Sequence, residues 1–159
     1  MNKPDFPIPD KILVFTLDES DYAITLSSVI KIIHAIEIRH LPNAPEIISG
    51  IINVQGNIIP VVDFRWRLGL DKRETDPDDR VIIADTGKRK VAIYVNTVEG
   101  IKELNPDAVV NSDDAISFAG YLKGIAKLEG NIILIYDIED FLSLDEEKML
   151  EKALRSETK

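Results

Sequence analysis

Acidic clusters are the first residues of this sequence that could do chemistry, because neighbouring carboxylates can bind a metal ion or transfer a proton. Three such clusters lie at residues 18–21, 76–79 and 113–114, and each coincides with an expected turn. None has the alternating oxygen ligands and the central glycine of a calcium-binding loop. We therefore interpret these carboxylates as solvent-exposed turn charges.

Asp63 and Asp137 are stronger candidates, because each ends the same repeated phrase. Both follow an expected strand and precede a short helical stretch, which is the position of an N-cap that accepts backbone N–H groups. The alternative is a carboxylate that acts in an enzyme or small-ligand site, and it would require a concave polar pocket between the two residues. No third group at a suitable spacing accompanies them, so the sequence favours two caps.

The remaining chemical candidates are incomplete. His34 and His40 have neither a cysteine nor a third ligand at a metal-like spacing. The segment from Gly50 to Asn57 lacks the Lys-Ser/Thr pair of a phosphate-binding loop, and no serine lies in a G-x-S-x-G elbow. Trp66 fits either an anchor for a partner or half-buried packing. We therefore expect no catalytic residue, no metal site and no cofactor, and a function that depends on binding surfaces.

Composition narrows the possible partners. The chain has 159 residues, a net charge of −9 and no cysteine. The negative charge argues against binding to nucleic acid and to anionic membrane surfaces, which attract basic proteins. No segment approaches the roughly 18–20 apolar residues of a membrane span, and the first residues lack the apolar stretch of a signal peptide. We therefore expect a cytosolic protein without disulfides.

One phrase occurs twice in the chain. Residues 50–63 read GIINVQGNIIPVVD, residues 124–137 read GIAKLEGNIILIYD, and seven of the 14 positions are identical. A second, weaker match aligns residues 12–32 with residues 81–101 without gaps. The order of elements is the same in both halves, which is typical of an internal duplication. We interpret each half as a small β unit of about five strands.

These units predict the architecture. Five short strands in a small unit satisfy their edges best by closing into a barrel. The sequence therefore predicts a mainly β protein with two tandem five-stranded barrels, short helices and a C-terminal helix. The expected boundaries are an N-terminal extension at 1–11, barrels at about 12–70 and 81–144 joined by a linker at 71–80, and an amphipathic helix with a tail at 145–159. The apolar stripe of that helix comprises Met149, Leu150, Ala153 and Leu154.

The first half also gives local predictions. Residues 12–17 and 22–26 are expected to form a hairpin with a four-residue acidic turn. Ser27 or Ser28 is placed to cap a short helix that continues through Ile33. The segment after that helix is expected to be extended.

A second group of local predictions surrounds the repeated phrase. Residues 43–46 have the arrangement of a capping box, which predicts a one-turn helix that ends at Gly50. Strands are expected at residues 51–54 and 58–62. Pro60 lies inside the second strand, which indicates an edge strand or an unpaired position.

The phrase at residues 50–63 is the most specific motif in the chain, and it is close to the pattern G-V-I-N-L-R-G-x-I-I-P-V-V-D-L. Further segments belong with it: FTL at 15–17, YAI at 22–24, Leu41 and Pro42 with Pro45, VAIYVNTV at 91–98, GIAK at 124–127 and LIYDI at 134–138. Together they make the chain resemble the CheW family, the coupling adaptors of chemosensory arrays. The resemblance covers nearly everything from residue 12 to about residue 144.

The resemblance implies two SH3-like barrels around a shared interface and no enzymatic activity. It implies an adaptor that bridges the regulatory domain of the histidine kinase CheA, itself CheW-like, to the cytoplasmic hairpin tips of chemoreceptors at membrane-associated arrays. By matching positions, the kinase-facing surface would include Val29, Ile38, Ser49 and Gly50. The receptor-facing surface would include Lys31, Ile32, Gln55, Gly56, Val98 and Ile101. For Val29, Ile32, Val98 and Ile101, plain core packing is an equally good interpretation.

The chain departs from the family pattern at one expected pair. Gln55 stands where the family usually has Arg, and Lys31 stands where it usually has Glu. We therefore expect these two residues to lie close together and the receptor contact to be altered. Asn96 and Ala92 also replace the common Asp and Gly. The alternative function is a CheW-like interaction module that serves a divergent, non-motility signalling system or another partner.

Overall fold

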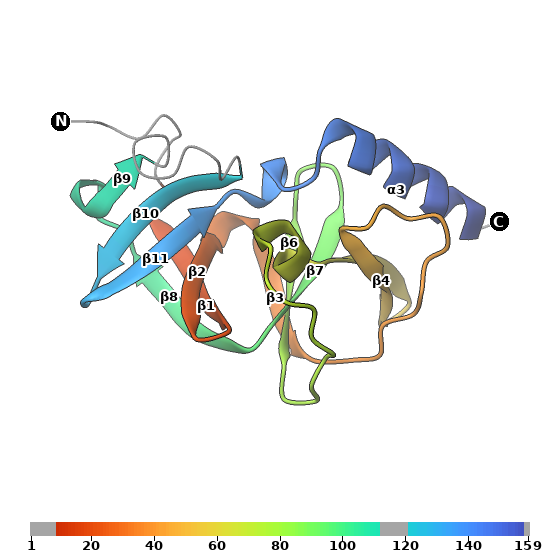
Figure 1. Cartoon of the computed structure of the whole chain (residues 1–159), viewed down its shortest axis with the longest axis horizontal. Helices are drawn as coiled ribbons and strands as arrows, with labels where there is room; N and C mark the ends of the chain where they lie inside the picture. Colours follow the sequence, from red (N-terminus) through yellow and green to blue (C-terminus); the bar gives the residue numbers. More distant parts are fainter. Residues whose placement is uncertain (1–8, 112–120, 158–159) are drawn as a thin grey trace.

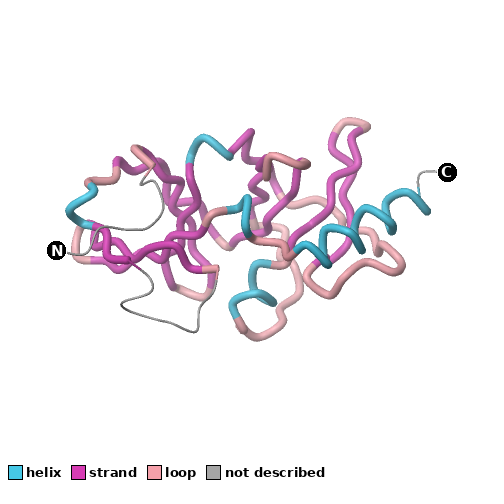
Figure 2. Tube along the Cα trace, turned by 90° about the horizontal axis from the view of Figure 1, so that it is seen from above, coloured by secondary structure: helices cyan, strands magenta, loops and turns pink. Residues whose placement is uncertain are grey.

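The computed structural model of the chain describes residues 9–111 and 121–157. The carboxylates at 113–114 and most of the extension predicted at 1–11 lie outside that part of the chain. The described residues are mainly strands, arranged in two sheets side by side, with a long C-terminal helix along one of them (Figure 1). Figure 2 shows the same arrangement from above. The mainly β class predicted from the sequence is confirmed.

One sheet has six strands in the order β8-β1-β2-β11-β10-β9. Its strands are β1 (Lys11–Leu17), β2 (Ser20–Thr25), β8 (Thr97–Glu103), β9 (Val109–Asn111), β10 (Leu122–Leu128) and β11 (Asn131–Tyr136). The other sheet has five strands in the order β3-β6-β7-β5-β4. Its strands are β3 (Val29–His34), β4 (Ile48–Val54), β5 (Asn57–Val62), β6 (Arg80–Asp85) and β7 (Lys90–Val95). Each sheet has one parallel pairing, β2 with β11 and β5 with β7, and is otherwise antiparallel.

Each sheet takes strands from both halves of the chain. The first hairpin, β1–β2, pairs with β8 and β11 of the second half. The equivalent hairpin of the second half, β6–β7, pairs with β3 and β5 of the first half. The prediction that residues 12–70 and 81–144 each form their own barrel is therefore wrong, because the halves exchange their first hairpins. The two copies of the hairpin have the same pattern at their edges. The sequence therefore allows each hairpin to pair with the strands of its own half or with those of the other half.

The register of the strands repeats with the sequence. Gly50 pairs with Val61 in β4–β5, and Gly124 pairs with Ile135 at the equivalent place in β10–β11. In both hairpins a shift of register directly precedes the glycine. The pairing of β3 with β6 and that of β1 with β8 also share the position of a shift. The two copies of the phrase therefore adopt the same local structure.

Successive side chains of a strand point to opposite faces of its sheet, and the buried side chains therefore form three separate cores. The shared core lies between the sheets and contains the aromatic residues Phe15, Tyr22, Phe64, Tyr136 and Phe141. The core of the six-stranded sheet contains Ile12, Val14, Ala23, Ala126, Ile133 and Ile135. The core of the five-stranded sheet contains their counterparts Val81, Ile83, Ala92, Ile52, Ile59 and Val61. Central strands such as β1 are consequently buried on both faces.

Strand pairing leaves both sheets open within the described residues. The end strands are β3 and β4 in one sheet and β8 and β9 in the other. The segment after β3 crosses to β4, where Arg39 and Ile51 form two backbone hydrogen bonds of 2.8 Å. The prediction of two closed five-stranded barrels is therefore not confirmed, and one sheet has β9 as a sixth strand.

Three local predictions differ from the structure. The first hairpin turns through two residues, Asp18 and Glu19, with φ of 49° and 70°, instead of four. The predicted helix through Ile33 is strand β3, because its β-branched side chains favour extended backbone. Only Leu26–Ser28 forms a single 3₁₀ turn, η1. Residues 42–43 and 46–47 form turns, and the one-turn helix predicted at 43–46 does not form.

Pro60 lies in β5, between β4 and β7, so the interpretation of β5 as an edge strand is wrong. Pro60 is also not fully unpaired, because it stands opposite Ile51 of β4; it has no partner only on the side of β7. The ladder between β5 and β7 consists of one pair, Val61 with Ala92. A proline, which has no N–H to donate, is tolerated where the ladder is this short.

The predicted C-terminal helix is present as α3 (Leu144–Glu157). It begins with a capping box in which Glu146 N–H donates to Ser143 Oγ at 3.1 Å and Ser143 N–H donates to Glu146 Oε1 at 2.8 Å. Three residues of the predicted stripe pack against the shared core: Leu150, Ala153 and Leu154. Met149, predicted on the same stripe, is 47% exposed.

Candidate functional site

The end strands β3 and β8 are equivalent edges of the two sheets. Val29 and Ile32 of β3 stand opposite shared-core residues of β6. Val98 and Ile101 of β8 stand opposite shared-core residues of β1. Residues opposite each other on neighbouring strands point to the same face of the sheet. The four aliphatic residues singled out in the sequence therefore lie on the shared-core side, two on each edge.

Exposure separates these four residues into two pairs. Val29 and Val98 are partly buried and pack against the shared core. Ile32 and Ile101 are 40% and 58% exposed. Core packing therefore describes the valines but not the isoleucines. Exposed aliphatic residues on an edge strand are typical of a surface that binds another chain.

Lys31, Gln55 and Gly56 belong to the same sheet. Lys31 is exposed on β3, whereas Gln55 and Gly56 form the β4–β5 turn with φ of 52° and 91°. Asn53 Oδ1 accepts the N–H of Gly56 at 2.8 Å and holds this turn. Because β3 and β4 are opposite end strands of the sheet, the proximity of Lys31 to Gln55 depends on how far the sheet curves. It stays a prediction.

A double-mutant cycle tests that proximity. Gln55→Arg alone should weaken the fold, because it places two cations near one another. Adding Lys31→Glu should relieve the repulsion, so the free energy of unfolding of the double variant should exceed the value expected from the sum of the single effects. The interaction energy is roughly 0.5–3 kcal/mol for a pair that is at least partly buried, and because both residues are exposed, about 0.2–1 kcal/mol is expected here. Denaturant melts of the four proteins measure this. Additive free energies would mean that the two positions are independent.

Gly50 is buried in β4 because the backbone after β3 passes directly over it. A Cβ atom at this position would lie 2.3 Å from the carbonyl oxygen of Arg39 and 2.7 Å from Cγ2 of Ile38. The paired hydrogen bonds between Arg39 and Ile51 hold that backbone in place. Glycine is therefore required at position 50 by the close approach of two backbone segments, and the prediction that it ends a helix is wrong.

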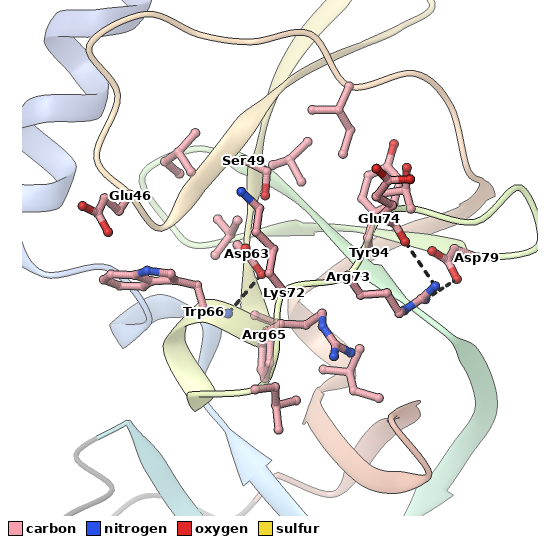
Figure 3. Close-up of a pocket in the computed structure, with 18 residues that line it drawn as sticks. Glu46, Ser49, Asp63, Arg65, Trp66, Lys72, Arg73, Glu74, Asp79 and Tyr94 are labelled. Atoms are coloured by element: carbon pink, nitrogen blue, oxygen red, sulfur yellow. Dashed lines mark hydrogen bonds and ion pairs between the residues drawn. The ribbon is translucent and has the colours of Figure 1, made fainter.

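A groove of about 500 Å³ opens beside Gly50 (Figure 3). It lies between β4, the short helix α1 (Phe64–Leu68) and the linker that follows α1. Ile38 and Ser49, both predicted to face the kinase, line it together with Trp66, which is 44% exposed. The rest of the apolar lining comprises Leu17, Ile48, Val61, Val62, Phe64, Leu70 and Tyr94. The groove brings together two of the four predicted kinase-facing residues and leaves out Val29 and Gly50.

The linker forms the charged wall of this groove. Arg73 donates to Asp79 Oδ1 at 2.8 Å, and Asp79 Oδ2 accepts the N–H of Asp76 at 2.9 Å. Asp79 is only 4% exposed, so this ion pair fixes the linker. Lys72 projects across the groove toward Ser49 (Figure 3). The sequence predicts residues 71–80 as a linker and the carboxylates at 76–79 as solvent-exposed turn charges. The buried Asp79 corrects the second interpretation, because a polar loop gives no pattern from which its ion pair could be predicted.

The predicted caps are confirmed. Asp63 accepts the N–H of Trp66 at 3.1 Å at the start of α1. Asp137 accepts the N–H of Glu139 at 2.9 Å at the start of the 3₁₀ turn η3 (Ile138–Asp140). Asp63 lines the groove, whereas Asp137 does not. The groove is therefore not the pocket between the two carboxylates that the enzyme interpretation requires.

Replacement of Asp63 by alanine should lower the free energy of unfolding by about 1 kcal/mol, because one N-cap hydrogen bond is lost. Asp137→Ala, which removes the equivalent cap outside the groove, is the matched control. Binding of partners should be unchanged in both variants, as titrations would measure. Loss of binding in Asp63→Ala at unchanged stability would reveal a functional carboxylate.

Arg65 joins α1 to the first hairpin of the other sheet. Its two terminal nitrogens donate to the two Asp18 oxygens at 2.7 and 2.6 Å, and it also donates to the carbonyl of Asp71 at 2.9 and 2.7 Å. The hydrogen bond from Arg65 lowers the pKa of Asp18, and the same bond raises the pKa of Arg65. Asp18 is therefore a paired turn carboxylate, which corrects its interpretation as simple solvent-exposed charge.

Other chemical candidates remain dispersed. His34 and His40 are both exposed. Within residues 9–111 and 121–157, no three His, Asp or Glu side chains are placed to hold a metal ion. No helix in this part of the chain is long and apolar enough to cross a membrane.

Comparison with known proteins agrees with this geometry. A sequence model of the CheW-like domain matches residues 11–146. The chain is 27% identical to chemotaxis protein CheW of Klebsiella aerogenes over 151 residues, covering 94% of this chain and 91% of that protein. It is 26% identical to chemotaxis protein CheW of Thermotoga maritima, covering 83% and 87%. The crystal structure of scaffolding protein TtCheW from Thermoanaerobacter tengcongensis superposes with a TM-score of 0.77 at 29% identity, covering 87% of this chain and 96% of that one. The chain therefore belongs to the family of proteins with a CheW-like domain.

Proposed function

We propose that the protein is a non-enzymatic adaptor that couples chemoreceptors to the histidine kinase CheA in a chemosensory complex. The observation that carries the proposal is the presence of two separate candidate surfaces on one small chain of this family. One is the pair of exposed edge strands, and the other is the groove beside Gly50. Relatives named chemotaxis protein and scaffolding protein support the same role.

The edge strands suit a helical hairpin. Ile32 and Ile101 expose aliphatic surface on the same side of the two sheets, where an amphipathic helix can bury its apolar face. We assign the receptor contact to these two residues together with Val98, Lys31 and the turn at Gln55. Val98 is half-buried and packs against the shared core beside this edge.

The groove suits a related β domain. Its floor is aliphatic, and its rim carries Trp66, a residue type that often dominates binding energy. We assign the kinase contact to Ile38 and Ser49, with Gly50 acting indirectly by allowing the backbone above β4 to pass closely. Val29 lies on the shared-core side and is the least suited of the four predicted residues.

The test is a pair of matched substitutions. Ile101→Glu should weaken binding of a receptor hairpin by at least about tenfold, because it places a charge in an apolar contact, and should leave binding of the CheA regulatory domain unchanged. Ile132→Glu is the control, because Ile132 on β11 is 59% exposed, against 58% for Ile101. Titration of both variants with both partners measures this. Equal receptor binding by the two variants would contradict the assignment of the edge.

Lys31 and Gln55 favour one alternative, a CheW-like module of a divergent signalling system. Both residues are exposed and lack the charges usual in the family. Binding to CheA without binding to ordinary receptor hairpins would support this alternative. Binding to neither would exclude the adaptor proposal in both forms.

A further inference from the structure

A second hollow lies outside both surfaces described above, between α3 and the β6–β7 turn. It has a volume of about 420 Å³. Its lining comprises Lys88, Arg89, Leu144, Glu147, Lys148, Glu151, Lys152 and Arg155. None of these residues lines the groove beside Gly50 or lies on β3 or β8. We refer to this surface as the α3 hollow.

The charge of the α3 hollow is opposite to that of the protein. Five basic and two acidic residues line it, a net charge of +3 on a chain whose net charge is −9. The two acids are already paired, since Arg89 contacts Glu147 at 3.2 Å and Glu151 at 2.8 Å. Arg155 also contacts Glu151, at 3.2 Å. The hydrogen bond from Arg89 lowers the pKa of Glu151.

Three lysines of the hollow therefore remain for a partner. Lys148 and Lys152 are exposed and lie one turn apart on the face of α3 opposite the buried Leu150. Lys88 reaches the same hollow from the β6–β7 turn. None of the three takes part in an ion pair with the described residues. The basic residue in the last turn of α3 is Arg155, so the helix dipole accounts for none of the three lysines.

One apolar residue accompanies these cations. Leu144 lines the hollow at the first position of α3 and is 71% exposed. A single exposed leucine beside lysines can contact one apolar side chain of a bound segment, while the lysines pair with carboxylates on either side of it. The charge and the shape of the hollow are thus complementary to a short acidic stretch with an apolar residue at its centre.

We propose that the α3 hollow binds a short acidic segment of a partner protein. An extended polyanion such as nucleic acid or an anionic membrane fits less well, because its remaining charges would face the acidic rest of the protein. A short acidic segment contacts only the positively charged hollow and not the acidic surface around it. This docking surface is additional to the receptor and kinase contacts and does not depend on them.

The experiment uses the full chain and a fluorescent peptide with glutamates on both sides of one leucine. Fluorescence anisotropy at low salt should detect binding that weakens as salt rises. Lys148→Glu with Lys152→Glu should reduce the affinity on the order of tenfold. Lys11→Glu with Lys127→Glu is the control, because both residues are exposed, lie on β1 and β10, and change the net charge equally. Lys88→Glu, on a turn outside the helix, tests the hollow without altering α3.

Two further probes separate the classes of partner. Serine in place of the leucine in the peptide should weaken binding, and so should Leu144→Ser in the protein. Equal losses in the hollow and control variants would overturn the proposal, because they would show an effect of net charge alone. Tighter binding to a DNA oligonucleotide or to vesicles of phosphatidylcholine and phosphatidylserine than to the peptide would also overturn it.

Discussion

Alanine at position 50 should lower the free energy of unfolding by about 3 kcal/mol or more, or prevent folding altogether. The added Cβ atom would lie 2.3 Å from the carbonyl oxygen of Arg39, which is backbone and cannot rotate away. Relief would require breaking the two hydrogen bonds between Arg39 and Ile51. The chain over β4, including Ile38, would then move, and one wall of the groove would be lost.

Gly130→Ala is the matched control for this substitution. Gly130 has a φ of 82° but no heavy atom within 4 Å of the position of an added Cβ. Its replacement should cost only about 1–2 kcal/mol of backbone strain. Denaturant melts of the three proteins give the comparison. If Gly50→Ala were no more destabilising than Gly130→Ala, the result would contradict the close approach of the backbone over β4.

Neither half of the chain should fold alone. A fragment of residues 1–75 contains β1 to β5, and a fragment of residues 76–159 contains β6 to β11 and α3, yet each sheet needs strands from both. The isolated fragments would leave the shared core and the edges of every exchanged hairpin unpaired. We therefore expect circular dichroism of each fragment to show an unfolded chain without a cooperative thermal transition.

Mixing the two fragments should restore one cooperative unit. The exchanged hairpins bury residues of both fragments in the same cores, so association and folding should occur together and the melting temperature should rise with concentration. Cooperative melting of either fragment by itself would contradict the exchange. That result would favour two independent barrels at residues 12–70 and 81–144.

Local features of the fold could be predicted from sequence because they depend on neighbouring residues. The caps Asp63 and Asp137 follow from a polar residue between a strand and a short helix. The repeated phrase gave the equivalent hairpins β4–β5 and β10–β11, because identical glycines and strand residues impose the same register. In contrast, the capping serine predicts a helix through Ile33, but the β-branched side chains that follow favour the strand that is present.

Features that depend on distant pairs could not be predicted from sequence. The two copies of the first hairpin carry equivalent patterns, so nothing in the sequence decides whether β1–β2 pairs within its own half or with β8 and β11. The groove was missed for the same reason, since its wall depends on the contact of Arg73 with Asp79. The exposure of Ile32 and Ile101 also became visible only when both edge strands were placed.

One chain of this adaptor should bind both proposed partners at once. The direct measurement is size-exclusion chromatography of the protein mixed with the CheA regulatory domain and a receptor hairpin, together and in pairs. Strands β3 and β8 share no residue with the groove, so we expect the CheA regulatory domain and the receptor hairpin to elute together when this protein is added and separately without it. Displacement of one partner by the other, or failure to bind either, would contradict it.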